Sequence, residues 1–327
     1  MKRALLALAL IAAPFAVILV ALGHGPLAVP AGDLLRALAG GGTAEAELAL
    51  SLRLPRIVTA LLVGGGVAGA GAAFQIIFRN PLVAPDLLGV SAGAGFGAAA
   101  AIVAGLGMLV VQGAAFAGGL AAAGLALLCA RLARGGDPRL SLVLCGIVTG
   151  ALASALLALM LFIAEPYAQL PALTYWLLGS FSRATAGELW IAAAPIASGL
   201  ALLLALGFRL DLLALGDEQA RSLGLNAPAF RRAAIAGATL STSAAVAISG
   251  VIGWIGLLAP HGARLIVGSR ANLLLPASIW LGALFALIVD RLSLAFGPAE
   301  VPAGLLAAGV GAPLFLVLFV STSRSGR

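Results

Sequence analysis

Long apolar runs, separated by short polar or proline-containing segments, follow one another along almost the whole chain. A helix needs about 20 mostly apolar residues to cross the hydrocarbon core of a bilayer. The pattern therefore predicts an all-α, polytopic membrane protein, built as a single transmembrane domain over residues 1–327. About ten transmembrane helices are expected, at residues 4–22, 56–78, 88–107, 110–131, 141–164, 189–208, 231–250, 251–266, 273–293 and 303–321.

The charged residues lie mostly between these runs and divide unevenly between the two sides. With a cytoplasmic N-terminus, the connections at 79–87, 132–140, 209–230 and 260–272 also lie in the cytoplasm. Of the 19 Lys and Arg residues, 14 then lie inside, and the five outside are Arg36, Arg53, Arg56, Arg183 and Arg291. Because an excess of Lys and Arg marks cytoplasmic loops, we expect both termini in the cytoplasm.

The composition excludes an ordinary soluble protein. The chain is 62% apolar and 9% charged, whereas soluble domains carry about 25% charged residues. Lipid is therefore the expected outer solvent. The net charge of +7 does not indicate a nucleic-acid partner, because the basic residues stand singly rather than in a patch. The 43 glycines predict closely packed helices, since small residues let helix backbones approach.

No group of residues predicts catalysis, a metal site or a bound cofactor. The two histidines, His24 and His261, fall at opposite predicted faces. The runs Gly64-Gly65-Gly66 and Gly93 to Gly97 lie inside apolar spans, and no Lys-Ser/Thr pair follows them as in a phosphate-binding loop. We therefore expect a protein that is not itself an enzyme and holds no ATP.

A weak internal repeat is present. The span opened by Arg56 ends in Phe78-Arg79-Asn80-Pro81, and Gly89 stands eight residues past that proline. The segment opened by Arg231 and Arg232 ends in Leu258-Ala259-Pro260-His261, and Gly268 again stands eight residues past the proline. Repeated proline-broken spans are typical of transporters.

The connection at 209–230 is the longest predicted in the cytoplasm, and it indicates two short helical pieces. Gly216 breaks them, Asp217 and Glu218 lie in a first turn where acidic groups favour the helix dipole, and Gly224 is a C-terminal cap. Two interpretations remain open here. The segment is either a solvated hairpin or a projection that inserts into a cytoplasmic partner, offering Ala220, Leu223 and Leu225 as an apolar face.

Strings spread in order from Arg53 to Phe315 resemble the permease subunit of type II ABC importers for iron chelates, haem and cobalamin. They are Arg53-Leu54-Pro55-Arg56; Phe78-Arg79-Asn80-Pro81-Leu82; Pro85 with Leu88-Gly89-Val90-Ser91; Tyr175-Trp176 with Gly179; Leu213 to Leu225; Gly256-Leu257 with Pro260-His261 and Arg264; Glu300 with Pro302 and Gly304; and Gly311-Ala312-Pro313 with Phe315.

The resemblance implies ten spans per subunit and a homodimer in the bacterial inner membrane, with its pathway along the two-fold axis. It also implies two cytoplasmic ABC ATPase subunits, which bind ATP and Mg, and a periplasmic substrate-binding protein. The implied cargo is a bulky iron chelate, with haem favoured over a ferric siderophore; cobalamin is the alternative. An ion-coupled secondary transporter is the rival class. It would need an ionisable residue in mid-membrane, for which Asp290 and Glu300 are the candidates.

The resemblance also assigns roles to single residues. It places Asp217, Glu218, Arg221 and Gly224 in the coupling helices that enter a cleft of the ATPase. Arg53 and Arg56 match outer arginines that meet acidic residues of the binding protein. Arg291 is a third docking candidate, although it directly follows Asp290, whereas the family's arginine stands four residues after the aspartate. The cytoplasmic gate is expected at two places, represented by Asn80, Leu82, Leu140 and Ser141.

The predicted span 141–164 is expected to face the transport pathway. Thr149, Ser154, Leu156 and Met160 stand on it, and it carries no charge within the membrane. Such a weakly binding apolar conduit suits a bulky ligand, because tight polar sites would hold the ligand back.

Overall fold

A computed structural model describes residues 15–23, 29–133, 137–183, 185–295 and 300–325 of the chain. All regular secondary structure in these residues is helical, which confirms the all-α prediction. A helix at 15–23 precedes the labelled elements. The labelled helices are α2 (Ala31–Leu38), α3 (Ala44–Ile77), the 3-10 helix η1 (Pro85–Leu88), α4 (Val90–Val103), α5 (Met108–Leu132), α6 (Pro138–Ile163), α7 (Gln169–Leu177), α8 (Ala186–Ala205), α9 (Gly207–Leu215), α10 (Asp217–Ser222), α11 (Ala227–Ser249), α12 (Ile255–Val267), α13 (Ala271–Ala295) and α14 (Ala303–Ser325).

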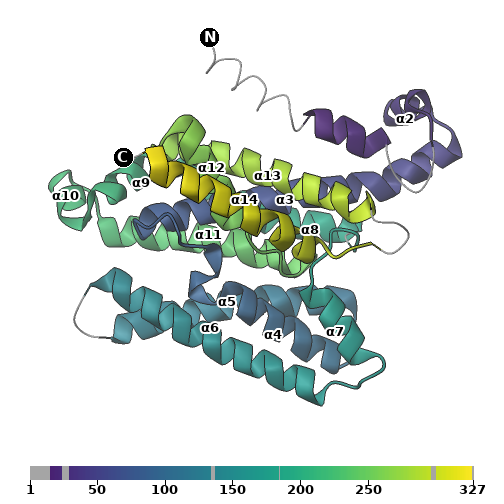
Figure 1. The fold of residues 1–327 in the computed structure, drawn as a ribbon. Helices are drawn as coiled ribbons and strands as arrows, with labels where there is room; N and C mark the ends of the chain where they lie inside the picture. Colours follow the sequence, from purple (N-terminus) through teal and green to yellow (C-terminus); the bar gives the residue numbers. More distant parts are fainter. Residues whose placement is uncertain (1–14, 24–28, 134–136, 184, 296–299, 326–327) are drawn as a thin grey trace, which may run out of the picture.

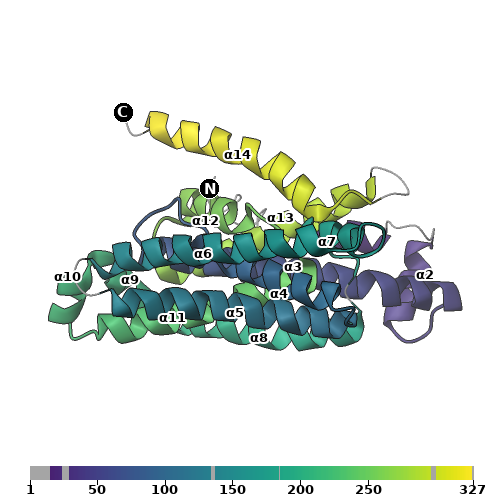
Figure 2. The same cartoon turned by 90° about the horizontal axis from the view of Figure 1, so that it is seen from below.

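The helices form an elongated bundle with two groups side by side (Figure 1). Helices α4 to α7 make one group, and α3, α8 and α11 to α14 make the other. The short helices α9 and α10 lie at one end of the bundle, while α2 and α7 lie toward the opposite end. We call these the α10 end and the α2 end. Helix α14 diverges from the rest of the bundle in the second view (Figure 2).

Each of the ten predicted spans contains a helix in the described residues, so the hydropathy pattern located the main elements. Five helices are long and apolar enough to cross a membrane by length and composition: α3, α5, α6, α8 and α13. The predicted eighth span corresponds to α12, which has 13 residues and contains Pro260. The short helices α2 and α7 were not predicted. The first prediction, residues 4–22, falls largely outside the described residues.

Helix α3 is the central element. It starts twelve residues before the predicted span, because Thr43 caps its N-terminus by accepting a hydrogen bond from the Ala46 N–H, with Glu45 and Glu47 in the first turn. In α3, 83% of the apolar window is buried, against 22% in α6. A Cβ at Gly71 would collide with the Gly256 carbonyl oxygen of α12, so glycine permits this close approach.

The two halves of the predicted repeat differ in one respect. Pro81 lies in the break after α3, where a proline ends a helix without losing a hydrogen bond. Pro260 instead lies inside α12, and the chain breaks earlier, between Ser249 and Ile255. At that break Gly250 has φ 72° and Trp254 has φ 70°. The second break therefore depends on left-handed backbone rather than on the proline.

Candidate coupling, docking and gate sites

The connection after α8 folds as the sequence predicts, into two short helices. Gly216 separates α9 from α10 with φ 124°, a conformation that favours glycine. Gly224 follows α10 with φ 80°. The N–H of Leu225 donates to the Ala220 carbonyl at 2.9 Å, and that of Gly224 donates to the Arg221 carbonyl at 2.9 Å. These two bonds form a Schellman cap, so Gly224 terminates the helix as expected.

Helix α10 presents a mainly polar outer surface. Ala220 and Leu225 are buried in the core of the bundle, so the apolar face expected from three residues is reduced to Leu223, which is 59% exposed. Glu218 and Arg221 are also exposed. The small Ala220 and the capping Leu225 turn inward because they close the hairpin against the core. The exposed side chains of this segment are therefore Glu218, Gln219, Arg221, Ser222 and Leu223.

Asp217 faces the bundle and joins three elements. Its Oδ1 accepts hydrogen bonds from Arg231 Nη2 of α11 at 2.5 Å and from Arg139 Nη2 of α6 at 2.7 Å. The hydrogen bond from Arg231 is the largest effect on the pKa of Asp217, and burial, which raises the pKa, is the next. The charge of Arg231 and the Arg139 contact lower it further, so the pKa of Asp217 lies below its usual range. Sequence reasoning missed both arginine partners.

Arginines beside the two candidate gate segments lie close to Asp217 and Gly216 of the α9–α10 connection. Asn80 and Leu82 lie in the turn after α3, where the Leu82 N–H donates to Asn80 Oδ1 at 2.9 Å. Leu140 and Ser141 lie in the first turn of α6, and Leu140 is 58% exposed. The neighbouring arginines approach α10, because Arg139 pairs with Asp217 and the Arg79 guanidinium lies against Gly216. A gating role for these residues stays a prediction.

The structure brings the three candidate docking arginines together at the α2 end. Arg56 donates through Nε to Asp290 and through Nη1 to Glu300, both at 2.7 Å. Arg291 pairs with the other oxygen of Asp290. Arg291 also donates to the Ala21 carbonyl at 3.2 Å, and Arg53 donates to the Leu22 carbonyl.

All three arginines therefore have partners within this chain. Arg53 and Arg291 stabilise the C-terminus of the helix at 15–23, where a positive charge favours the helix dipole. Sequence reasoning missed the pairing of Arg56. A signal was available, because an aspartate such as Asp290 at the end of an apolar run requires a cation. Whether the arginines also dock a binding protein stays a prediction.

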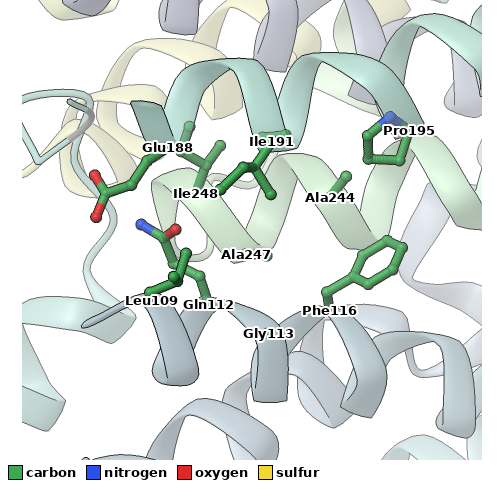
Figure 3. Close-up of a pocket in the computed structure, with 11 residues that line it drawn as sticks. Leu109, Gln112, Gly113, Phe116, Glu188, Ile191, Pro195, Ala244, Ala247 and Ile248 are labelled. Carbon is green, nitrogen blue, oxygen red and sulfur yellow. The ribbon is translucent and has the colours of Figure 1, made fainter. Parts of the chain in front are cut away.

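A groove of about 320 Å³ lies between α5, α8 and α11 (Figure 3). Its wall is apolar apart from Gln112 and Glu188, which lie near each other at one end of the view. Glu188 already accepts hydrogen bonds from Thr185 in a capping box. The groove has too few polar groups to orient a polar solute. Elsewhere in the described residues, no three His, Cys, Asp or Glu side chains gather in a metal-binding arrangement.

The fold and these sites define a multi-pass membrane transport subunit. The FecCD transport family model matches residues 10–321, and the chain belongs to that family, the permeases of type II ABC importers for iron chelates, molybdate and cobalamin. Subunits of this class lack ATPase sites, and ATP binding belongs to their partner ATPases. The class also implies a binding protein and a dimeric permease.

Individual relatives differ in cargo. The chain is 38% identical over 327 residues to the Fe(3+)-citrate import system permease protein YfmE of Bacillus subtilis, covering 99% of this chain and 97% of the relative. It is 36% identical over 315 residues to the molybdate import system permease protein MolB of Haemophilus influenzae, covering 95% and 93%. A solved structure described as an inward-facing metal-chelate type ABC transporter has 34% identity and a TM-score of 0.88, covering 96% and 98%.

Proposed function

We propose that this chain forms the membrane pathway of a binding-protein-dependent ABC importer for a bulky iron chelate, with haem as the preferred cargo. The observation that carries the proposal is the surface of α6. Its exposed large side chains are all apolar: Leu140, Leu144, Ile147, Val148, Leu152, Leu159, Phe162 and Ile163. An apolar wall suits a bulky ligand that must be released again, because it offers no tight polar site.

The four positions on α6 that the sequence placed along the pathway support the same interpretation. Thr149 is buried, and its hydroxyl donates to the Cys145 carbonyl at 2.8 Å, so it offers little to a solute. Ser154 is exposed, while Leu156 and Met160 are half-buried. A small oxyanion such as molybdate would need hydrogen-bond donors along its path, and one serine hydroxyl supplies little of that.

We further propose that two copies of the chain enclose the pathway. Helix α6 has little of its surface buried. Among the described helices, α14 makes its main contacts with α12 and α13 alone. It diverges from the rest of the bundle (Figure 2). Leu314, Leu316 and Val317 of α14 are exposed. Association of these helices with a second copy would enclose an apolar space between the subunits.

We propose the orientation from the roles that the resemblance gives to the residues at the two ends. The α10 end is proposed to face the cytoplasm, where Asp217, Glu218, Arg221 and Gly224 serve the contact with two ABC ATPases. Arg53, Arg56 and Arg291 at the α2 end are proposed to face the periplasm and the binding protein. Both chain termini would then be cytoplasmic, although residues 1–14 and 326–327 lie outside the described part. The setting is the bacterial inner membrane.

Two rival functions are separable. A cobalamin importer would use the same architecture with another bulky ligand. An ion-coupled secondary transporter would need an ionisable group free to bind the ion. Asp290 is fully buried, but it is neutralised by Arg56 and Arg291, so it supports this class poorly.

The test is uptake into proteoliposomes that contain the chain, its ATPase and its binding protein. Haem, a ferric siderophore, ferric citrate, cobalamin and molybdate are offered separately, with and without ATP. The proposal expects ATP-dependent uptake of haem above the other cargoes. Uptake that follows an imposed proton gradient without the ATPase would refute the importer class, and preferred uptake of cobalamin or molybdate would refute the cargo.

A further inference from the structure

The Asp217 carboxylate joins α10 to two other helices, one near it in the sequence and one far from it. Arg231 stands 14 residues from Asp217 and belongs to α11, which directly follows the coupling segment. Arg139 stands 78 residues away and belongs to the first turn of α6. The Arg231 pair therefore closes a local hairpin. The Arg139 pair joins α10 to a distant helix.

The start of α6 is built to transmit a force applied at Arg139. Asp137 caps the helix by accepting a hydrogen bond from the Arg139 N–H at 2.9 Å, and Pro138 occupies the first position. A capped, proline-started terminus frays less than an uncapped one, since fewer of its N–H groups are left unsatisfied. Movement of the Arg139 side chain would then move the α6 backbone with it.

The junction is also a site of concentrated charge. Arg79, Arg139 and Arg231 surround Asp217, and all three interact electrostatically with one another or with it. Breaking the Asp217 contact would leave these guanidinium groups to repel one another. A displacement of α10 would therefore change the balance of forces at the starts of α6 and α11 and at the end of α3.

The pair is accessible enough to break and reform. The Asp217 side chain is 31% exposed and the Arg139 side chain 17% exposed. An open cavity of about 560 Å³ borders both residues, together with Glu218 and Arg221 on the outer side of α10. Water can solvate the separated charges there, so the two states can differ by a small free energy that partner binding can shift.

We propose that the Asp217–Arg139 ion pair is the link by which α10 moves α6, and that Arg139 is a positioning residue for coupling ATP hydrolysis to transport. The proposal rests on the function proposed above, because it takes α10 as the ATPase contact and α6 as a pathway helix. The Arg231 pair keeps α10 folded against its own connection. The Arg139 pair transmits a displacement of α10 to α6.

The experiment measures cargo taken up per ATP hydrolysed by the reconstituted complex with its ATPase and binding protein. Arg139→Gln is expected to retain assembly and basal ATP hydrolysis, with a slightly lower thermal unfolding midpoint because one of the two Asp217 pairs is lost. Its uptake per ATP should fall about fivefold or more, as coupling free energies between sites typically give. Arg139→Lys keeps the charge and should restore most of that ratio. Arg232→Gln, an exposed arginine beside Arg231, is the matched control.

The outcomes separate this link from the proposed function. If the wild-type complex shows no ATP-driven uptake of any cargo, the proposed function fails. If the wild type transports and Arg139→Gln keeps its uptake per ATP, the link is wrong while the function stands. Should Arg139→Gln fail to assemble, Arg139→Lys decides: a lysine variant that assembles but stays uncoupled overturns a charge-based link, and a coupled one supports it.

Discussion

Arg56 donates to the fully buried Asp290 through Nε at 2.7 Å, so a guanidinium on α3 is paired with a carboxylate on α13 although 234 residues separate them. The same guanidinium reaches Glu300, just before α14, at 2.7 Å. One side chain thus fastens the central helix to the last two spans at the α2 end. Removing it would leave a buried carboxylate with only Arg291.

We expect Arg56→Ala to destabilise the protein by about 3 kcal/mol. Breaking a buried ion pair by removing one partner usually costs about 3–5 kcal/mol, and the remaining contact of Asp290 with Arg291 places this case at the low end. The measurement is the free energy of unfolding in detergent. Arg36→Ala is the control: its pair with Asp33 spans 3.6 Å with Arg36 73% exposed. It should cost less than about 1 kcal/mol, and equal losses would contradict the assignment.

The Asp217 pairs predict a pH dependence with a definite sign. The folded pKa of Asp217 is lowered, chiefly by the Arg231 hydrogen bond. Its contribution is therefore fully present above the unfolded pKa of about 3.9 and is lost as the pH falls through the lower folded value. At neutral pH, Asp217→Asn should cost about 1–2 kcal/mol, reduced by partial exposure.

Thermal unfolding of the wild type and of Asp217→Asn, followed from pH 7 to the acid limit, checks this dependence. The gap between the two should stay constant down to about pH 5 and then close as the pH falls further. Glu218→Gln, on the exposed side of the same helix, should leave a small gap at every pH. A gap for Asp217→Asn that widens in acid would contradict the ion-pair account.

The sequence predicted the spans because lipid leaves few alternatives to apolar helices. It also predicted the form of the connection at 209–230, since Gly216 and Gly224 act through local backbone geometry. Helices α2 and α7 escaped prediction because each has fewer than ten residues and no full apolar run. Their helical form depends on packing at the α2 end.

The pairings within the sites could not be predicted in the same way. A hydropathy pattern is local, whereas Arg139 meets Asp217 across 78 residues. The resemblance gave the candidate docking arginines an expected role but no neighbours, so it did not show that Arg56 is neutralised by Asp290 and Glu300. In both cases the sequence supplied the charges, and only the packing of the helices paired them.

The close approach of α3 and α12 yields a prediction about glycine. Gly71→Ala would drive a Cβ into the Gly256 carbonyl oxygen. The backbone of α3 fixes the position of the Cβ and the backbone of α12 fixes that of the oxygen, so neither atom can rotate away. We expect the free energy of unfolding to fall by about 1–3 kcal/mol because of overpacking.

Gly113→Ala on α5 is the control. Its Cβ would meet nothing within 4 Å, and the variant should be neutral or stabilising, since alanine is more favourable than glycine in a helix by up to about 1 kcal/mol. Equal unfolding midpoints for the two variants would show that α3 and α12 can separate at little cost.

The proposed docking of a binding protein at the α2 end predicts a salt-dependent affinity. Arg53→Gln removes one of the positive charges that lie together there. Because Arg53 is only 6% exposed, its charge acts on the binding protein through the electric field at this end, and the substitution should weaken binding about twofold at low ionic strength, the low end of what surface charges contribute. The effect should shrink in high salt, because salt screens charges across an interface.

The control for this prediction is Arg36→Gln. It changes a more exposed arginine at the same end that matches no docking position. Affinity of the permease in detergent for its binding protein, measured at two salt concentrations, compares them. If Arg36→Gln weakens binding as much as Arg53→Gln does, the interaction follows general positive charge, and the residue assignment fails.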